Sequence, residues 1–323
     1  MRFREVGGKR VSLVGLSIRV PTSAWLVGIQ RETRQRIAQS VSYAQELGVN
    51  IFDIQVPFFT NLTPRVYRWD IVELIQKNIT DASTVFISVA NPIGIDRAMF
   101  GWQDIPSSTR CPSEVLNLIY TVPSVFASLC GKLDRTAAFN ALCASVGLFD
   151  GTAIQWEKFE DQFGIEIVAN SIRYSLVKRD AETDLLPYAI AKNKLLVVRD
   201  ALGGGVLSDN YSRTLRPHDL RRFNGHFRPD ALERMQPILM TLAALARIYD
   251  ATPSQVALAW VFSHPNTIVI PASGSLTELK MNLEACALKL TRAELDELAF
   301  ASDIYSASRG PRFIRSLRTR IGI

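Results

Sequence analysis

Five charged residues lie at or just beyond the carboxyl ends of predicted strands, where side chains can act on a bound molecule. They are Arg19, Asp53, Arg173, Arg199 and Asp200. Because active sites of parallel sheets and barrels form at that end, we expect these side chains to lie near one another. A carboxylate there can transfer protons, and a guanidinium can hold a carboxylate, phosphate or enolate. This set therefore suits acid–base chemistry on an anionic substrate.

Two interpretations of these charges stay open. A charge removed from water costs free energy unless it is paired or contacts a ligand. In the first interpretation, Asp53 or Asp200 pairs with an arginine and the charges only fill the site. In the second, Arg19, Arg173 and Arg199 outnumber the two acids and bind an anionic or hydroxyl-rich small molecule.

The stretch 251–283 predicts a helix, a strand and a second helix. Thr252 and Gln255 have the spacing of a capping box, which starts the first helix. Residues 267–270 form a short apolar run, typical of a strand covered on both faces. The loop 272–275 leads into the second helix, whose first backbone N–H groups form a natural anion site.

The rest of the chain alternates strand and helix patterns, which indicates an α/β fold. On the strand at 49–53, side chains alternate between faces, so we expect Ile51 and Asp53 in the interior and Phe52 toward the helices. The other predicted strands are 11–18, 84–89, 118–122, 165–171 and 195–199, and the helices are 31–47, 67–79, 152–163, 229–249 and 291–301.

Three motifs resemble the aldo/keto reductase family: RYSLVKRDAETDLLP at 173–187, VRDALGGGVL at 198–207, and the stretch 251–283. The resemblance implies a (β/α)8 TIM barrel with an N-terminal β-hairpin near Phe3. It also implies that residues 1–323 form a single domain. The arginine-rich segment 303–323 is either a solvated tail or, as in that family, a segment laid over the barrel mouth that brings positive charge to a ligand.

The resemblance also implies which residues would carry hydride chemistry. In that family a tyrosine donates a proton to the substrate carbonyl, helped by a lysine, an aspartate and a histidine. Asp53 matches the aspartate, but Phe58, Ala90 and Thr121 stand at the other three positions. We therefore expect the hydride-transfer tetrad to be lost.

The positions that would hold NADPH differ as well. The resemblance places the carboxamide ligands at Gly147, Leu148 and Ser171, and the aromatic that stacks on nicotinamide at Arg199. Glu278 stands where a basic residue holds the 2′-phosphate, and its charge would repel that group. We expect no cofactor, or only weak NADP binding through the residues that still match: Ser273, Ser275 and Asn282.

The favoured hypothesis is a non-redox enzyme, such as an isomerase, lyase or cyclase, acting on a small polar or anionic substrate. Asp53 and Asp200 would be its acid–base residues. One alternative is a non-catalytic regulatory or scaffold protein, and another is an NAD(P)H-dependent carbonyl reductase with an atypical site. The residues expected to bind substrate are Arg19, Gln55, Phe58, Arg173 and Arg199.

Composition fits an ordinary globular protein, with 47% hydrophobic and 21% charged residues among 323. Five arginines of the final segment supply most of the net charge of +6. No nucleic-acid-binding motif, membrane-spanning run or secretory signal is evident, so we expect a cytoplasmic protein that binds neither nucleic acid nor membrane. The four cysteines show no metal-binding spacing.

Overall fold

The computed structural model falls into two compact units. The barrel unit comprises Met1–Arg173, Ala181–Arg199 and Pro265–Leu283, and the helical unit comprises Tyr174–Asp180, Asp200–His264 and Glu284–Ile323. Within these spans the structure describes residues 2–6, 9–19, 30–55, 71, 74–75, 77–79, 86–91, 116–121, 145–163, 166–208, 217, 224–271 and 275–307.

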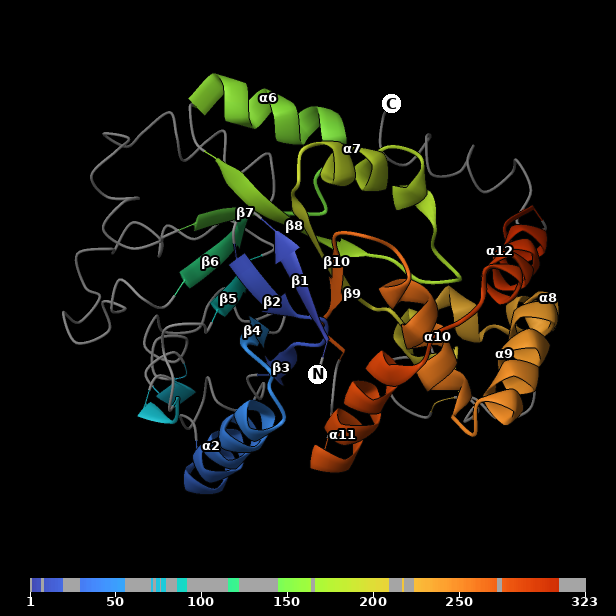
Figure 1. The fold of residues 1–323 in the computed structure, drawn as a ribbon, viewed down its shortest axis with the longest axis horizontal. Helices are drawn as coiled ribbons and strands as arrows, with labels where there is room; N and C mark the ends of the chain where they lie inside the picture. Colours follow the sequence, from blue (N-terminus) through green and yellow to red (C-terminus); the bar gives the residue numbers. More distant parts are fainter. Residues whose placement is uncertain are drawn as a thin grey trace. The chain divides into compact units, whose positions relative to one another are not determined.

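The barrel unit is built on eight parallel strands that lie side by side in sequence order (Figure 1). Their bounds are β3 Leu16–Arg19, β4 Ile51–Gln55, β5 Phe86–Asn91, β6 Leu116–Thr121, β7 Ser145–Phe149, β8 Ile167–Arg173, β9 Leu195–Arg199 and β10 Thr267–Val269.

The two edges of this sheet meet through the residues just before β3. Val14 forms a parallel bridge with Val269 of β10. Two hydrogen bonds of 2.8 Å flank the bridge, from the Gly15 amide to the Val269 carbonyl and from the Val269 amide to the Leu13 carbonyl. The architecture is the predicted (β/α)8 barrel.

Gly15 permits this close approach. A Cβ atom at Gly15 would lie 2.7 Å from Cγ2 of Ile51 and 3.1 Å from Cγ1 of Ile270. Both neighbours are almost completely buried, so they have little room to move aside. The junction between the first and last strands therefore depends on the absence of a side chain at this residue.

The interior and exterior faces of β4 follow the predicted alternation. Ile51 packs with Val197 of β9 and Ile268 of β10, inside the barrel. Phe52 packs instead with Ile37 and Val41 of the helix α2 (Arg31–Glu46), outside it. Asp53 follows on the interior side and is buried.

An N-terminal hairpin lies at the amino ends of the strands, as predicted. β1 (Phe3–Val6) and β2 (Lys9–Ser12) pair in antiparallel register. Nε of Arg4 donates to the carbonyl of Thr267, the first residue of β10. The strand predicted at 11–18 is therefore divided between β2 and β3, because the chain leaves the hairpin before it enters the barrel.

The helices of the barrel unit lie outside the strands (Figure 1). Besides α2 they are α6 Ala153–Phe163, α7 Leu185–Ala191 and α11 Leu276–Glu284. The described residues also form four short 3₁₀ turns: η5 Asp180–Glu182, η6 Gly203–Gly205, η8 Gly225–Phe227 and η9 Ala285–Ala287. No helix in the described part of the chain is long and apolar enough to cross a membrane.

The helical unit contains α8 Pro229–Arg234, α9 Gln236–Ile248, α10 Pro253–Phe262 and α12 Arg292–Ala307. The prediction of one continuous helix at 229–249 is wrong, because the structure has two helices there. Pro237 cannot continue a helix, since it lacks an N–H donor and its ring clashes with the preceding turn. It starts a new helix, α9, instead. The capping box of Thr252 and Gln255 is confirmed at α10.

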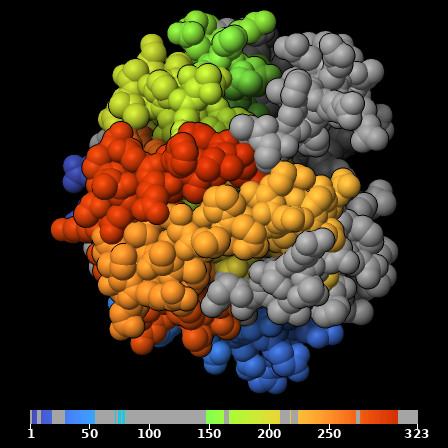
Figure 2. Space-filling model, turned by 90° about the vertical axis from the view of Figure 1, so that its right-hand side faces the viewer, coloured from blue at the N-terminus to red at the C-terminus, as the bar shows by residue number. Residues whose placement is uncertain are grey.

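α12 packs against α9, as Figure 2 shows with α12 in red beside the orange helix. It is longer than the helix predicted at 291–301, so residues 303–307 of the proposed arginine-rich tail are helical. Residues 308–323, which include the five arginines, lie outside the described residues.

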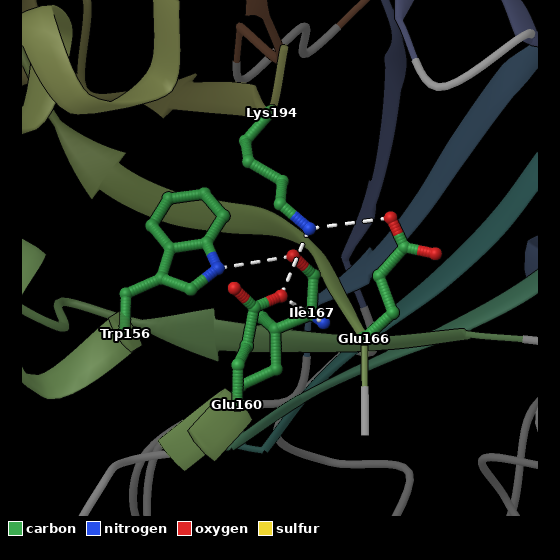
Figure 3. Close-up of polar contacts among 5 residues, drawn as sticks. All are labelled: Trp156, Glu160, Glu166, Ile167 and Lys194. Carbon is green, nitrogen blue, oxygen red and sulfur yellow. Dashed lines mark hydrogen bonds and ion pairs between the residues drawn. The ribbon is translucent and has the colours of Figure 1, made fainter. Parts of the chain in front are cut away.

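At the amino ends of β8 and β9, a buried lysine ties both strands to α6 (Figure 3). Nζ of Lys194 donates to Oε1 of Glu160 at 2.8 Å and to Oε1 of Glu166 at 3.2 Å. Glu160 also accepts from the backbone amide of Ile167 at 2.7 Å. The indole of Trp156 donates to the Ile167 carbonyl at 3.0 Å, so both backbone groups of this residue are bound to α6.

This network predicts a large loss of stability when Lys194 is replaced. Lys194→Met keeps most of the aliphatic stem but leaves Glu160, whose side chain is 21% exposed, without its cation. We expect the free energy of unfolding in urea to fall by about 3 kcal/mol. Lys192→Met, at an exposed position nearby, is the control. Equal effects of the two substitutions would contradict this role of Lys194.

Candidate functional site

Two arginines lie side by side at the carboxyl ends of adjacent strands. Arg173 ends β8, Arg199 ends β9, and the two residues are register partners in the parallel ladder. Like charges on neighbouring strands repel each other, so this pair needs a negative group close by.

Asp150, which directly follows β7, supplies that negative group. Its Oδ2 lies 2.6 Å from Nη2 of Arg199 and 4.0 Å from Nε of Arg173. Asp150 has a backbone φ of 53°, a left-handed conformation that aspartate tolerates better than most residues. The sequence predictions did not include Asp150. The one local signal for it was the Asp-Gly pair after a strand, which is typical of a tight turn.

The backbone around Asp150 is bound firmly to β8. The Asp150 amide donates to the Ser171 carbonyl at 2.9 Å. The buried side chain of Asn170 donates to the Gly151 carbonyl at 2.7 Å and accepts from the Gly151 amide at 3.3 Å. The strand that carries Arg173 therefore also fixes the position of the acid.

Arg199 is held on two sides. Its guanidinium carbon lies 3.7 Å from the centre of the Phe149 ring, a cation–π contact, while Asp150 forms the ion pair. The side chain is 19% exposed. Burial lowers the pKa of Arg199, and the charge of Arg173 adds to this, whereas Asp150 and Asp53 act in the opposite direction.

Two nitrogen atoms of Arg199 still lack an aligned acceptor. Nη2 lies 2.6 Å from Oδ2 of Asp150 but is not aligned with it as a hydrogen-bond donor, and among the described residues the buried Nε has no acceptor. A buried donor without an acceptor is costly, so this side chain can accept a further polar partner.

Asp53 contributes a second acid on the interior face. It is 5% exposed, and its register partner on β3 is Ser17. Oγ of Ser17 is buried without a hydrogen-bond partner among the described residues. The barrel interior is therefore polar at Ser17 and Asp53, which lie side by side on β3 and β4.

Asp200 has a local role in the helical unit. Its Oδ1 accepts from the backbone amide of Gly204, and its φ is 60°. It thereby caps the turn η6, in which all three glycines have positive φ. This hydrogen bond occupies a carboxylate oxygen that the sequence interpretation assigned to catalysis.

The structure describes the remaining predicted site residues only in part. Arg19 and Gln55 are register partners at the ends of β3 and β4, but their side chains are outside the described part of the structure. Ser275 caps α11, because its Oγ accepts from the Glu278 amide at 3.2 Å. Asn282 lies within the same helix. Two predicted residues lie outside the described residues: Phe58 and Ser273.

Residues 142–302 match the model of the aldo/keto reductase family. An uncharacterized oxidoreductase of Mycobacterium tuberculosis is 32% identical over 173 residues, 54% of either chain. Aldo-keto reductase str7 of Strobilurus tenacellus is 32% identical over 135 residues, 40% of either chain. The chain belongs to the aldo/keto reductase superfamily. Its matches span about half the length of these curated relatives or less.

Solved aldo/keto reductases share the fold over almost the whole chain. The glycerol dehydrogenase AKR11B4 of Gluconobacter oxydans has a TM-score of 0.71, 16% identity, and covers 93% of this chain and 94% of its own. An aldo/keto reductase of Klebsiella pneumoniae in complex with NADP and acetate has a TM-score of 0.60 and 16% identity, covering 92% and 93%.

These relatives do not support the expectation that no cofactor binds, because two solved Klebsiella pneumoniae structures hold NADP or NADPH. Nor do the relatives' names support a loss of hydride chemistry, since they are oxidoreductases and aldo-keto reductases.

The described residues at the nicotinamide end do not fit that ring. The resemblance places two carboxamide ligands at Leu148 and Ser171, which are 0% and 4% exposed, and Leu148 lies within β7 rather than after it. Arg199, at the position of the stacking aromatic, instead lies on Phe149 and pairs with Asp150. We therefore derive no chemical step through nicotinamide.

The two arginines should differ in their effect on stability. Arg199→Met removes a stacked, mostly buried ion pair, so we expect the free energy of unfolding to fall by about 2 kcal/mol. Arg173→Met removes a half-exposed side chain whose acid is 4.0 Å away, and we expect a change within about 0.5 kcal/mol. Urea unfolding of both variants measures the difference. A larger loss for Arg173→Met would contradict this assignment.

Proposed function

We propose that the carboxyl end of this aldo/keto reductase barrel binds a small carboxylate-bearing molecule and performs acid–base chemistry without nicotinamide. The observation that supports this proposal most directly is the position of Arg199, whose guanidinium lies on the Phe149 ring and pairs with Asp150. A charged side chain held in this way cannot serve as the aromatic surface for a nicotinamide ring.

Arg173 is the residue best suited to contact the ligand. Its side chain is 52% exposed, and its nearest described acid is 4.0 Å away. A guanidinium has five N–H donors in a planar fork that matches a carboxylate. One distant ion pair leaves most of these donors available to a bound molecule.

The positive charge at this end is smaller than the sequence interpretation assumed. Asp150 was not counted there, and it adds a third acid beside Asp53 and Asp200. In the barrel unit the described charges at the site are two arginines and two aspartates. A ligand with one negative charge and several hydroxyl groups therefore suits the site better than a highly charged one.

Asp53 is the acid–base candidate of this site. It faces the barrel interior, is almost fully buried, and its charge acts on Arg199. A carboxylate in that position can accept a proton from a carbon next to a carboxylate or carbonyl, while an arginine stabilises the charge that develops. Isomerisation, dehydration and cyclisation need only such a positioned proton transfer.

A second candidate is an NADP(H)-dependent oxidoreductase. It is favoured by the names of the relatives and by the NADP and NADPH held in solved neighbours. At the adenosine end, Ser275 at the start of α11 and Asn282 within it match the family pattern.

Titration of the protein with NADPH and NADH separates the two candidates. We expect dissociation constants weaker than about 100 μM for both, equivalent to less than about 5.5 kcal/mol of binding free energy. Calorimetry and quenching of protein fluorescence both measure this. Low-micromolar binding of NADPH would overturn the non-redox proposal and favour the oxidoreductase.

Arg173→Gln tests the ligand contact. We expect the dissociation constant of a monocarboxylate probe, acetate or pyruvate, to rise about tenfold, because one charge-assisted hydrogen bond contributes about 1.5–3 kcal/mol. Calorimetry at constant ionic strength measures the change. Arg292→Gln, at a side chain that is 87% exposed on α12, is the control. Unchanged probe binding by Arg173→Gln would exclude Arg173 as the contact.

A further inference from the structure

We propose that Asp150 is a specificity-determining residue that makes this site select monoanionic carboxylates over dianionic phosphates. The inference rests on the proposed function, because it concerns the anion bound beside Arg173.

The geometry places one carboxylate oxygen next to both cations. Oδ2 of Asp150 is 2.6 Å from Arg199 and 4.0 Å from Arg173, and the Asp150 side chain is 41% exposed. Any anion that binds the Arg173 guanidinium therefore lies within a few ångströms of a fixed negative charge.

The charge balance then penalises a second negative charge on the ligand. Among the described side chains of the site, Arg173 and Arg199 carry two positive charges, while Asp150 and Asp53 carry two negative charges. Coulomb attraction and repulsion both grow in proportion to the ligand's charge, so a neutral cluster gives a dianion little net advantage. The desolvation cost grows more steeply with charge, which disfavours the dianion.

Hydrogen bonding does not reverse this preference. A carboxylate already matches the planar fork of an arginine with two oxygen atoms, so a phosphate gains little from its third oxygen at one guanidinium. The discrimination therefore depends on the fixed charge of Asp150 rather than on the number of donors.

The ion pair with Arg199 holds the Asp150 carboxylate, and the backbone that carries it is fixed as well. The Asp150 amide is bound to the Ser171 carbonyl at 2.9 Å, and the following Gly151 is held by Asn170. A Cβ at Gly151 would lie 2.8 Å from Cδ1 of the buried Leu148, so the turn is also closely packed. The carboxylate is a built part of the site.

Asp150→Asn tests the proposal, because it removes the charge with almost no change of shape. Asparagine also tolerates the left-handed backbone of this residue. The dissociation constants of acetate and inorganic phosphate are measured by calorimetry, at constant ionic strength and a pH at which phosphate is dianionic. We expect the affinity for phosphate, relative to acetate, to rise about tenfold.

Two further variants make the result decisive. Asp150→Gly suits a φ of 53° and removes the same charge. It should therefore also raise the affinity for phosphate relative to acetate, even if the asparagine variant folds poorly. Asp161→Asn, at an exposed residue of α6, should leave the ratio unchanged.

The possible outcomes separate the two proposals. If the wild-type protein binds acetate but neither Asp150 variant raises the ratio, selectivity by Asp150 is wrong and the carboxylate site stands. If the wild-type protein binds neither anion, the proposed function and this inference are both overturned.

Discussion

The repulsion between two arginines on adjacent parallel strands is the constraint on which this site depends. Arg173 and Arg199 are register partners, so the strand spacing itself brings their side chains together. Asp150 relieves the repulsion, and its backbone is held in a left-handed conformation and hydrogen-bonded to β8. Arg199 is thereby held against Phe149 and Asp150, at the end of the barrel where we propose that a ligand binds.

The opposite end of the same strands serves stability. Lys194, just before β9, holds Glu160 and Glu166 near the start of β8. The N-terminal hairpin bonds to the start of β10, and Gly15 lets the first and last strands meet. This division, with stabilising contacts at the amino ends and the polar residues of the site at the carboxyl ends, is the general organisation of TIM barrels. It lets residues of the site change while the barrel is preserved.

The elements that could be predicted from the sequence depend on local patterns. The capping box at Thr252 and the strand Leu195–Arg199 were predicted with the bounds that the structure has, because their signals lie within a few neighbouring residues. The unbroken helix at 229–249 was wrong, although Pro237 was visible as a helix breaker.

The site was harder to predict because its key contact joins residues far apart in the chain. Asp150 and Arg199 belong to different βα units, and no sequence spacing links them. The strand-end argument correctly placed Arg173 beside Arg199, since register follows from the parallel order of strands. It could not find an acid in the loop after β7, nor show that Asp200 caps its own glycine turn.

The central claim is that Arg173 offers an anion site while Asp150 keeps Arg199 on Phe149. Crystals soaked in bromide, a monoanion located by its anomalous scattering, test both parts together. We expect a bromide peak beside the Arg173 guanidinium, with the ion pair of Asp150 and Arg199 unchanged. The central claim would be contradicted by the absence of bromide at Arg173, or by Arg199 turned away from Phe149 and Asp150.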